Sequence, residues 1–181
     1  MVTIMRNFFL KSNLGFTLIE MIVVIGVLAI LAVAGMVALN PMAQFQKAND
    51  SKRKADLSQI QKALETYYQD NGSYPLPSTS TPFYRITVVG PTGLVTIDWG
   101  KQWQPYMNLL PKDPSASKNY VYYSTGQSYI IYASLDRGSF DPQSCQGMVN
   151  GECQSIQANV GAVNSCGGPC NFGVSSPNVS P

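Results

Sequence analysis

The sequence predicts an α+β protein in which a long N-terminal transmembrane and amphipathic helix packs on a small antiparallel β-sheet head, followed by an irregular C-terminal tail. Three observations predict this fold. An uncharged apolar run is followed by a stretch with helical periodicity. Short runs rich in β-branched and aromatic residues come next. The last part of the chain is dominated by Gly, Ser, Asn and Pro.

The composition argues against most familiar enzyme classes. The chain has 181 residues, a formal net charge of +2 and no histidine. The missing histidine removes the usual general base, the Ser-His and Cys-His nucleophile pairs and every His-ligated metal site. Apart from Arg6 and Lys11, basic and acidic side chains balance, so direct nucleic-acid binding is not indicated. We therefore expect a non-enzymatic protein without a cofactor.

The uncharged run at residues 21–39 is long enough to cross a bilayer as a helix. It exceeds the apolar region of an ordinary secretory signal, although Ala32 and Ala34 imitate a cleavage site. Glu20 stands directly against the run. A carboxylate beside hydrocarbon is costly unless it has a partner or stays hydrated at the headgroup boundary. The sequence thus predicts a membrane anchor whose acid needs either a cation or water.

The sequence GFTLIE at residues 15–20, which follows a basic leader and precedes the apolar run, resembles the type III signal of type IV prepilins. The resemblance implies that residues 1–15 are a leader, cut after Gly15 by a prepilin peptidase that also methylates the new N-terminal Phe16. It further implies that Glu20 sets subunit registration through the Phe16 amine of a neighbouring copy. Such pairing would offset the cost of burying the carboxylate in a packed bundle.

One helix is expected to continue from the membrane into the head. Its first half, residues 16–41, would span the membrane and form the filament core, and its second half, residues 42–72, would be amphipathic. Pro41 predicts a kink because proline removes a backbone hydrogen bond and clashes with the preceding turn. Gly72 is expected to end the helix.

The amphipathic half carries an apolar stripe and many charges. The basic cluster at residues 52–54 is flanked by acids, and we expect it on a solvated face. The apolar residues recur at helical spacing and should pack against the sheet: Leu57, Ile60, Leu64 and Tyr67.

The head is predicted at residues 73–141, as a connecting loop followed by the sheet. The tyrosine-rich strands could stack on bases, but alternating aromatics in strands are more typical of a core, and we favour packing. Four runs have strand composition and lie between turn residues: 85–89, 94–97, 120–123 and 129–133.

Two further stretches resemble the major pseudopilins of type II secretion. The resemblance lies in the sequence of residues 56–75 and in the sequence LPKDP at residues 110–114. Those proteins bind calcium in a loop after the sheet, and Asp136 and Asp141 occupy a comparable region. Calcium needs six to eight oxygen ligands, so we favour solvated turn residues over a calcium site.

The tail at residues 142–181 is rich in Gly, Ser and Asn and is expected to be irregular. It holds all four cysteines, which an exported segment would oxidise to disulfides. The sequence cannot choose among three pairings, and neighbour pairing is preferred. A Cys₄ zinc site competes, but the spacing lacks paired knuckles. The cysteines are Cys145, Cys153, Cys166 and Cys170.

The function ranked first is a structural subunit of a type IV pilus-like filament. A major pseudopilin of a type II secretion system is the alternative, because the tail is unlike typical major pseudopilins. A membrane-anchored extracytoplasmic binding domain is the second alternative. The resemblance implies copies of the same chain, the peptidase and methyltransferase, an inner-membrane platform protein, an assembly ATPase and minor pilins as partners. It places the precursor in the inner membrane and the filament in the periplasm or at the cell surface.

Overall fold

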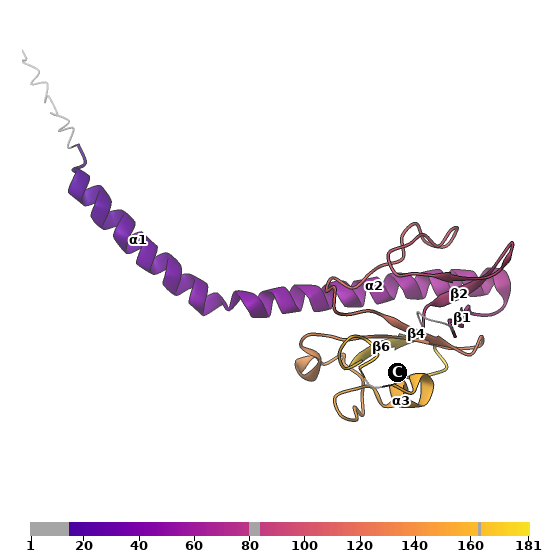
Figure 1. Ribbon diagram of the computed structural model, residues 1–181. Coiled ribbons are helices and arrows are strands. Elements are labelled where there is room, and N and C mark those ends of the chain that lie inside the picture. The colour runs from indigo at the N-terminus through magenta and orange to yellow at the C-terminus, as the bar shows by residue number, and fades with distance from the viewer. Residues whose placement is uncertain (1–14, 80–83, 163) are drawn as a thin grey trace, which may run out of the picture. The chain divides into compact units, whose positions relative to one another are not determined.

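The computed structural model describes three stretches of the chain: residues 15–79, 84–162 and 164–181 (Figure 1). The predicted leader, with Arg6 and Lys11, lies outside the described residues except for Gly15. The chain forms two compact units, Met1–Met42 and Ala43–Pro181.

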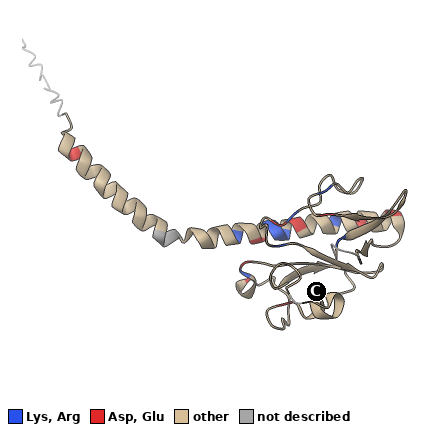
Figure 2. Cartoon of the chain, viewed as in Figure 1, with Lys and Arg blue, Asp and Glu red and all other residues tan. Residues whose placement is uncertain are grey.

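The first unit is built on α1, Leu18–Leu39. Thr17 and Glu20 cap its start reciprocally: the Thr17 hydroxyl accepts the backbone N–H of Glu20 at 3.2 Å, and the Glu20 carboxylate accepts the backbone N–H of Thr17 at 3.5 Å. Figure 2 shows almost all of α1 free of charge. The part Leu18–Met36 is long and apolar enough to cross a membrane, and none of it is buried within the chain.

The predicted continuous helix is interrupted. α2 runs Pro41–Asn71, so the two helices are separated by Asn40. Asn40 has a φ of 41°, in the left-handed region that asparagine tolerates better than most residues. Pro41 starts the next helix, where its missing N–H costs nothing because no helical partner is available there. The break therefore falls directly before the proline at which a kink was predicted.

The apolar stripe of α2 is confirmed as the helix face that enters the core of the head. Leu57, Ile60 and Leu64 are fully buried. Tyr67 is partly buried against the same hydrophobic cluster. Gly72, with a φ of 71°, ends the helix by accepting a left-handed conformation, as expected.

The head contains two three-stranded antiparallel sheets rather than one small sheet. The four predicted strands are all present, and the structure adds β1 and β6. The first sheet has the order β1-β2-β3, with strands Leu76–Pro77, Ile86–Gly90 and Gly93–Ile97. The second has the order β4-β5-β6, with strands Val121–Ser124, Tyr129–Ala133 and Phe172–Ser175.

The strand tyrosines fill the core, as expected from their alternation. Tyr120, Tyr122 and Tyr129 are at most 1% exposed. The rings of Trp99 and Tyr120 meet edge to face with centroids 5.7 Å apart, and Tyr74 and Tyr129 do so at 4.7 Å. These aromatic pairs belong to one cluster that also contains residues of α2 and of both sheets.

The prediction of an irregular tail is wrong for two segments. The tail forms α3, Gln154–Val160, and the strand β6, which pairs antiparallel with β5. Ile156 and Val160 lie one helical turn apart and are buried against Val121 and Ile130 in a second hydrophobic cluster. The overall composition of the tail did not predict these segments, because their few apolar residues lie among many Gly, Ser, Asn and Pro residues. A short 3₁₀ helix, η1, occupies Gly138–Phe140 before the tail.

Candidate functional site

The two residues at the predicted cleavage site, Gly15 and Phe16, are exposed. The ring of Phe16 is 74% exposed, and nothing lies within 4 Å of the position that a Cβ on Gly15 would occupy. Both residues precede the first turn of α1. A peptide bond in such a setting is accessible to a peptidase, and its cleavage would leave a free amine four residues before Glu20.

The apolar side chains of α1 pack against nothing else in the described parts of the chain. Leu18, Ile19, Val27 and Leu28 point to four different sides of the helix, and all are more than half exposed. A helix that is apolar all round is stable only when lipid or other helices cover it. α1 therefore needs lipid or other helices around all of its sides.

The head contains a buried ionic cluster centred on Arg53. Its guanidinium is 0% exposed and forms a two-pronged contact with Asp113, with Nε 2.9 Å from Oδ2 and an Nη atom 3.1 Å from Oδ1. Ion pairs with Asp50 at 2.8 Å and Asp136 at 2.9 Å complete it. Burial alone would lower the pKa of Arg53, but its hydrogen bonds and charge contacts with Asp113 and Asp136 outweigh burial and raise it.

The expectation that residues 52–54 form a solvated face is wrong for Arg53. The sequence did carry a signal, because Arg53 precedes Leu57 by four residues and Ile60 by seven, and so belongs to the buried stripe. Its partner Asp113 belongs to the sequence LPKDP, which resembles major pseudopilins and for which the sequence predicted no structural role. That contact ties α2 to a loop sixty residues away.

The two acids considered for calcium both face cations. Asp136 contacts Arg53 and Lys118, and Asp141 contacts Lys54 at 2.6 Å. Burial by itself would raise the pKa of Asp136, yet hydrogen bonds from Lys118 and Arg53 lower it. Within residues 15–79, 84–162 and 164–181, no group of three or more Cys, Asp or Glu side chains is placed to hold a metal ion.

The cysteines form two disulfides between neighbours in sequence, with Cα atoms 5.2 Å and 5.5 Å apart. Beside them, one oxygen of the buried Glu152 carboxylate accepts the backbone N–H groups of Asn164 and Cys170. This arrangement pins the tail against the second sheet and leaves the sulfurs unavailable to zinc. The pairs are Cys145–Cys153 and Cys166–Cys170.

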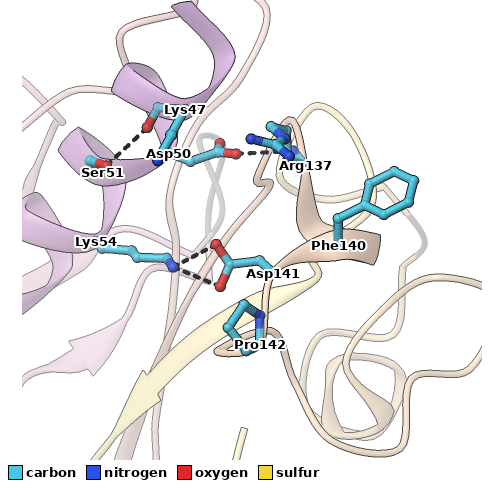
Figure 3. A pocket seen from close by; sticks show the side chains of 8 residues that line it. All are labelled: Lys47, Asp50, Ser51, Lys54, Arg137, Phe140, Asp141 and Pro142. Carbon is cyan, nitrogen blue, oxygen red and sulfur yellow. Dashed lines mark hydrogen bonds and ion pairs between the residues drawn. The ribbon is translucent and has the colours of Figure 1, made fainter. Parts of the chain in front are cut away.

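A pocket of about 260 Å³ lies between α2 and η1 (Figure 3). Its acids are already engaged: Asp141 holds Lys54, and Asp50 accepts the backbone N–H of Arg137 at 3.0 Å. Phe140 at its rim is 82% exposed. The pocket is lined by Lys47, Asp50, Ser51, Lys54, Arg137, Phe140, Asp141 and Pro142.

An exposed apolar N-terminal helix with an acid in its first turn, joined to an α+β head, defines the class of type IV pilin-like filament subunits. Family comparisons place the chain within that class. The model of type II secretion system protein G matches residues 40–142, and the prokaryotic N-terminal methylation motif matches residues 10–36. The chain belongs to the type II secretion system protein G family. The first match ends before the disulfide-bonded tail.

Curated relatives agree with this family. The chain is 36% identical to the type II secretion system core protein G of Pseudomonas aeruginosa, over 72% of this chain and 81% of that protein. It is 32% identical to the protein of the same name from Vibrio cholerae, over 67% of this chain and 78% of that one. The protein of Escherichia coli is 30% identical over 70% and 77%. No solved structure gives a significant match. These matches favour the pseudopilin alternative over the generic pilus subunit that the sequence analysis ranked first.

Proposed function

We propose that this chain is the major pseudopilin of a type II secretion system, a non-enzymatic subunit that polymerises through its N-terminal helix. The observation that carries the proposal is α1 itself, whose apolar side chains are exposed all round and which begins with an acid. The family match and the names of the relatives select secretion over a surface pilus. The tail remains the feature that distinguishes this chain from a typical member.

Maturation prepares the contact that drives assembly. The peptidase cuts between Gly15 and Phe16 and methylates the Phe16 amine, and the cationic amine of one copy then meets the Glu20 carboxylate of another. Among the described residues of one chain, the only hydrogen-bond donor to the Glu20 carboxylate is the backbone N–H of Thr17, at a long 3.5 Å, which leaves acceptor capacity for the amine. The packing of α1 against copies of itself replaces lipid contacts, and the pairing fixes the stagger between neighbours.

The remaining partners follow from this role. The precursor is anchored in the inner membrane with its head outside the cytoplasm, where the disulfides are stable. A platform protein and an assembly ATPase extract it, and minor pseudopilins share the filament. The roles of pilus subunit and of anchored binding domain are the competing functions. Both lack support from the names of the relatives.

The test is co-expression of the full chain with and without a prepilin peptidase. We expect peptidase-dependent loss of the leader, a methylated N terminus at Phe16 by mass spectrometry, and sedimentable filaments. Glu20→Gln should be processed but should yield about tenfold less filament, because the amine loses its charged partner. Thr17→Ala is the matched control, since it removes the helix cap and keeps the carboxylate. Normal filament yield from Glu20→Gln, or a functional uncut monomer, would refute the proposal.

A further inference from the structure

One acid has no partner in the part of the chain that the structure describes. Nine of the ten Asp and Glu side chains accept a hydrogen bond or form an ion pair within the described residues, from Glu20 at the start of α1 to the buried Glu152 in the tail. Asp70 is the exception among the described acids, and it is exposed in the last turn of α2. No residue in the described stretches pairs with its charge.

Two cations near the opposite end of α2 also form no ion pair with a described residue. Lys47 is exposed near the start of the helix, and the guanidinium of Arg137 faces the same pocket from the loop before η1 (Figure 3). Neither side chain forms an ion pair or donates a hydrogen bond within the described parts of the chain. The carboxylates beside them, Asp50 and Asp141, each accept three hydrogen bonds, none of which comes from the side chain of Lys47 or Arg137. The pocket can therefore take one more carboxylate.

The position of Asp70 opposes the helix dipole. A helix is stabilised by acids near its N terminus and by bases near its C terminus, and α2 has neither an acid in its first turn nor a base in its last. Asp70 lies in the last turn of α2, where the dipole disfavours an acid, whereas Lys47 lies in the second turn, beyond the reach of the N-terminal partial charges. A cation supplied by a second chain would offset the unfavourable position of Asp70.

Lys47 and Asp70 cannot meet within one molecule. They are 23 residues apart in the continuous helix α2, which is about 35 Å at 1.5 Å per residue. Two different surfaces that recognise each other at opposite ends of one helix form a head-to-tail contact, which repeats without closing and so generates a filament. The charges thus match the kind of symmetry that a polymer needs.

We propose that Asp70 of one copy docks between Lys47 and Arg137 of a second copy displaced along the filament. The inference rests on the proposed filament function and adds to it a head contact that is separate from the contact at Glu20. The carboxylate is shared by a lysine and an arginine in a partly enclosed pocket, where the ion pair is less screened than on an open surface. Anionic lipid headgroups carry comparable charge and are the competing occupant.

The test is charge reversal in the full chain co-expressed with a prepilin peptidase. Asp70→Lys alone, and Lys47→Glu with Arg137→Glu, should each reduce sedimentable filament about tenfold, because like charges then face each other. Combining all three substitutions should restore the yield. Lys101→Glu, which reverses another exposed and unpaired cation, is the matched control and should have no effect. Formation of both disulfides and an unchanged circular dichroism spectrum verify that each head is folded.

Each outcome decides the proposal. Rescue by the triple variant supports docking, while normal yield from either reversal, or failure of the folded triple variant to recover, overturns it. Loss of binding to vesicles containing phosphatidylglycerol in the Lys47→Glu, Arg137→Glu variant, with Asp70→Lys assembling normally, would assign the pocket to lipid instead. If the unmodified chain forms no filament, the proposed function itself fails. If it does, and only Glu20→Gln impairs assembly, the docking contact alone is refuted.

Discussion

A single buried guanidinium holds three segments of the head together. Arg53 is supplied by α2, Asp113 by the loop after the first sheet, and Asp136 by the segment after β5. The ion pairs with Arg53 hold the carboxylates of Asp113 and Asp136 in position. Asp50 also pairs with Arg53 and accepts the backbone N–H groups of Asp136 and Arg137. The cluster is therefore a joint between distant parts of the sequence rather than a surface ion pair.

Replacing Arg53 by methionine should destabilise the head strongly. The substitution keeps most of the side-chain volume but leaves the carboxylates around it without their shared cation. Breaking a buried ion pair in this way costs about 3–5 kcal/mol. The measurement is the free energy of unfolding in denaturant for the full chain in detergent. Lys62→Met, an exposed lysine on the same helix, is the control and should change it by about 0.5 kcal/mol at most.

Acid should weaken the head through Asp136 and Asp141. Burial would raise the pKa of both carboxyl groups, but hydrogen bonds from Lys118 and Arg53 to Asp136, and from Lys54 to Asp141, lower both values. Their contribution to stability is complete above the ordinary pKa of about 3.8 and is lost as the pH falls through the lowered values.

We expect the free energy of unfolding to fall between about pH 5 and pH 2, and to fall less steeply in Asp141→Asn. Denaturant titrations at several pH values measure this slope. Asp70→Asn, which removes an acid without a partner in the described chain, should leave the slope unchanged. An Asp141→Asn variant with the slope of the unmodified chain would contradict the assignment.

At the scale of elements, periodicity and β-composition predicted α1, α2 and four strands, because these signals are local, whereas α3 was missed. β1 was missed because two residues, one of them proline, carry no strand pattern. The sequence of β6 likewise has no clear strand pattern, and this strand forms by pairing with β5. The buried charges of α2 were missed for a similar reason: their partners come from loops that the sequence cannot place in space.

The disulfides should be needed for the order of the tail rather than of the whole head. They close loops with sequence separations of 8 and 4, for which chain entropy predicts a gain of about 2 kcal/mol each. Replacing all four cysteines by serine should expose α3 and β6 to limited proteolysis while α2 and the first sheet stay protected. Mass spectrometry of the fragments measures this, with the unmodified chain as control. Uniform cleavage across the head would contradict it.

At the scale of the whole molecule, the two units have different requirements. The unit Ala43–Pro181 contains both hydrophobic clusters, all the ion pairs among the described residues and both disulfides. The unit Met1–Met42 offers an apolar helix with no partner of its own within the described chain. The folded core and the apolar surface for polymerisation thus belong to separate parts of the chain, and the proposed contact of Asp70 adds a polar contact from the head.

A chain shortened to residues 43–181 should therefore fold and remain monomeric without detergent. Its core is complete, and the exposed apolar helix that would cause association is absent. We expect a single species by size exclusion and a thermal midpoint within about 5 °C of the full chain in detergent. Aggregation or loss of a cooperative transition would contradict the division into two units, and the full chain without detergent serves as the aggregating control.

The order of the cysteines along the chain has a consequence for biogenesis. Each cysteine is bonded to its nearest neighbour in sequence, Cys145 to Cys153 and then Cys166 to Cys170. An oxidant that joins thiols in the order in which they emerge from a translocation channel would produce these two bonds directly. The chain can thus reach its native covalent state without an isomerase to reshuffle wrong pairs.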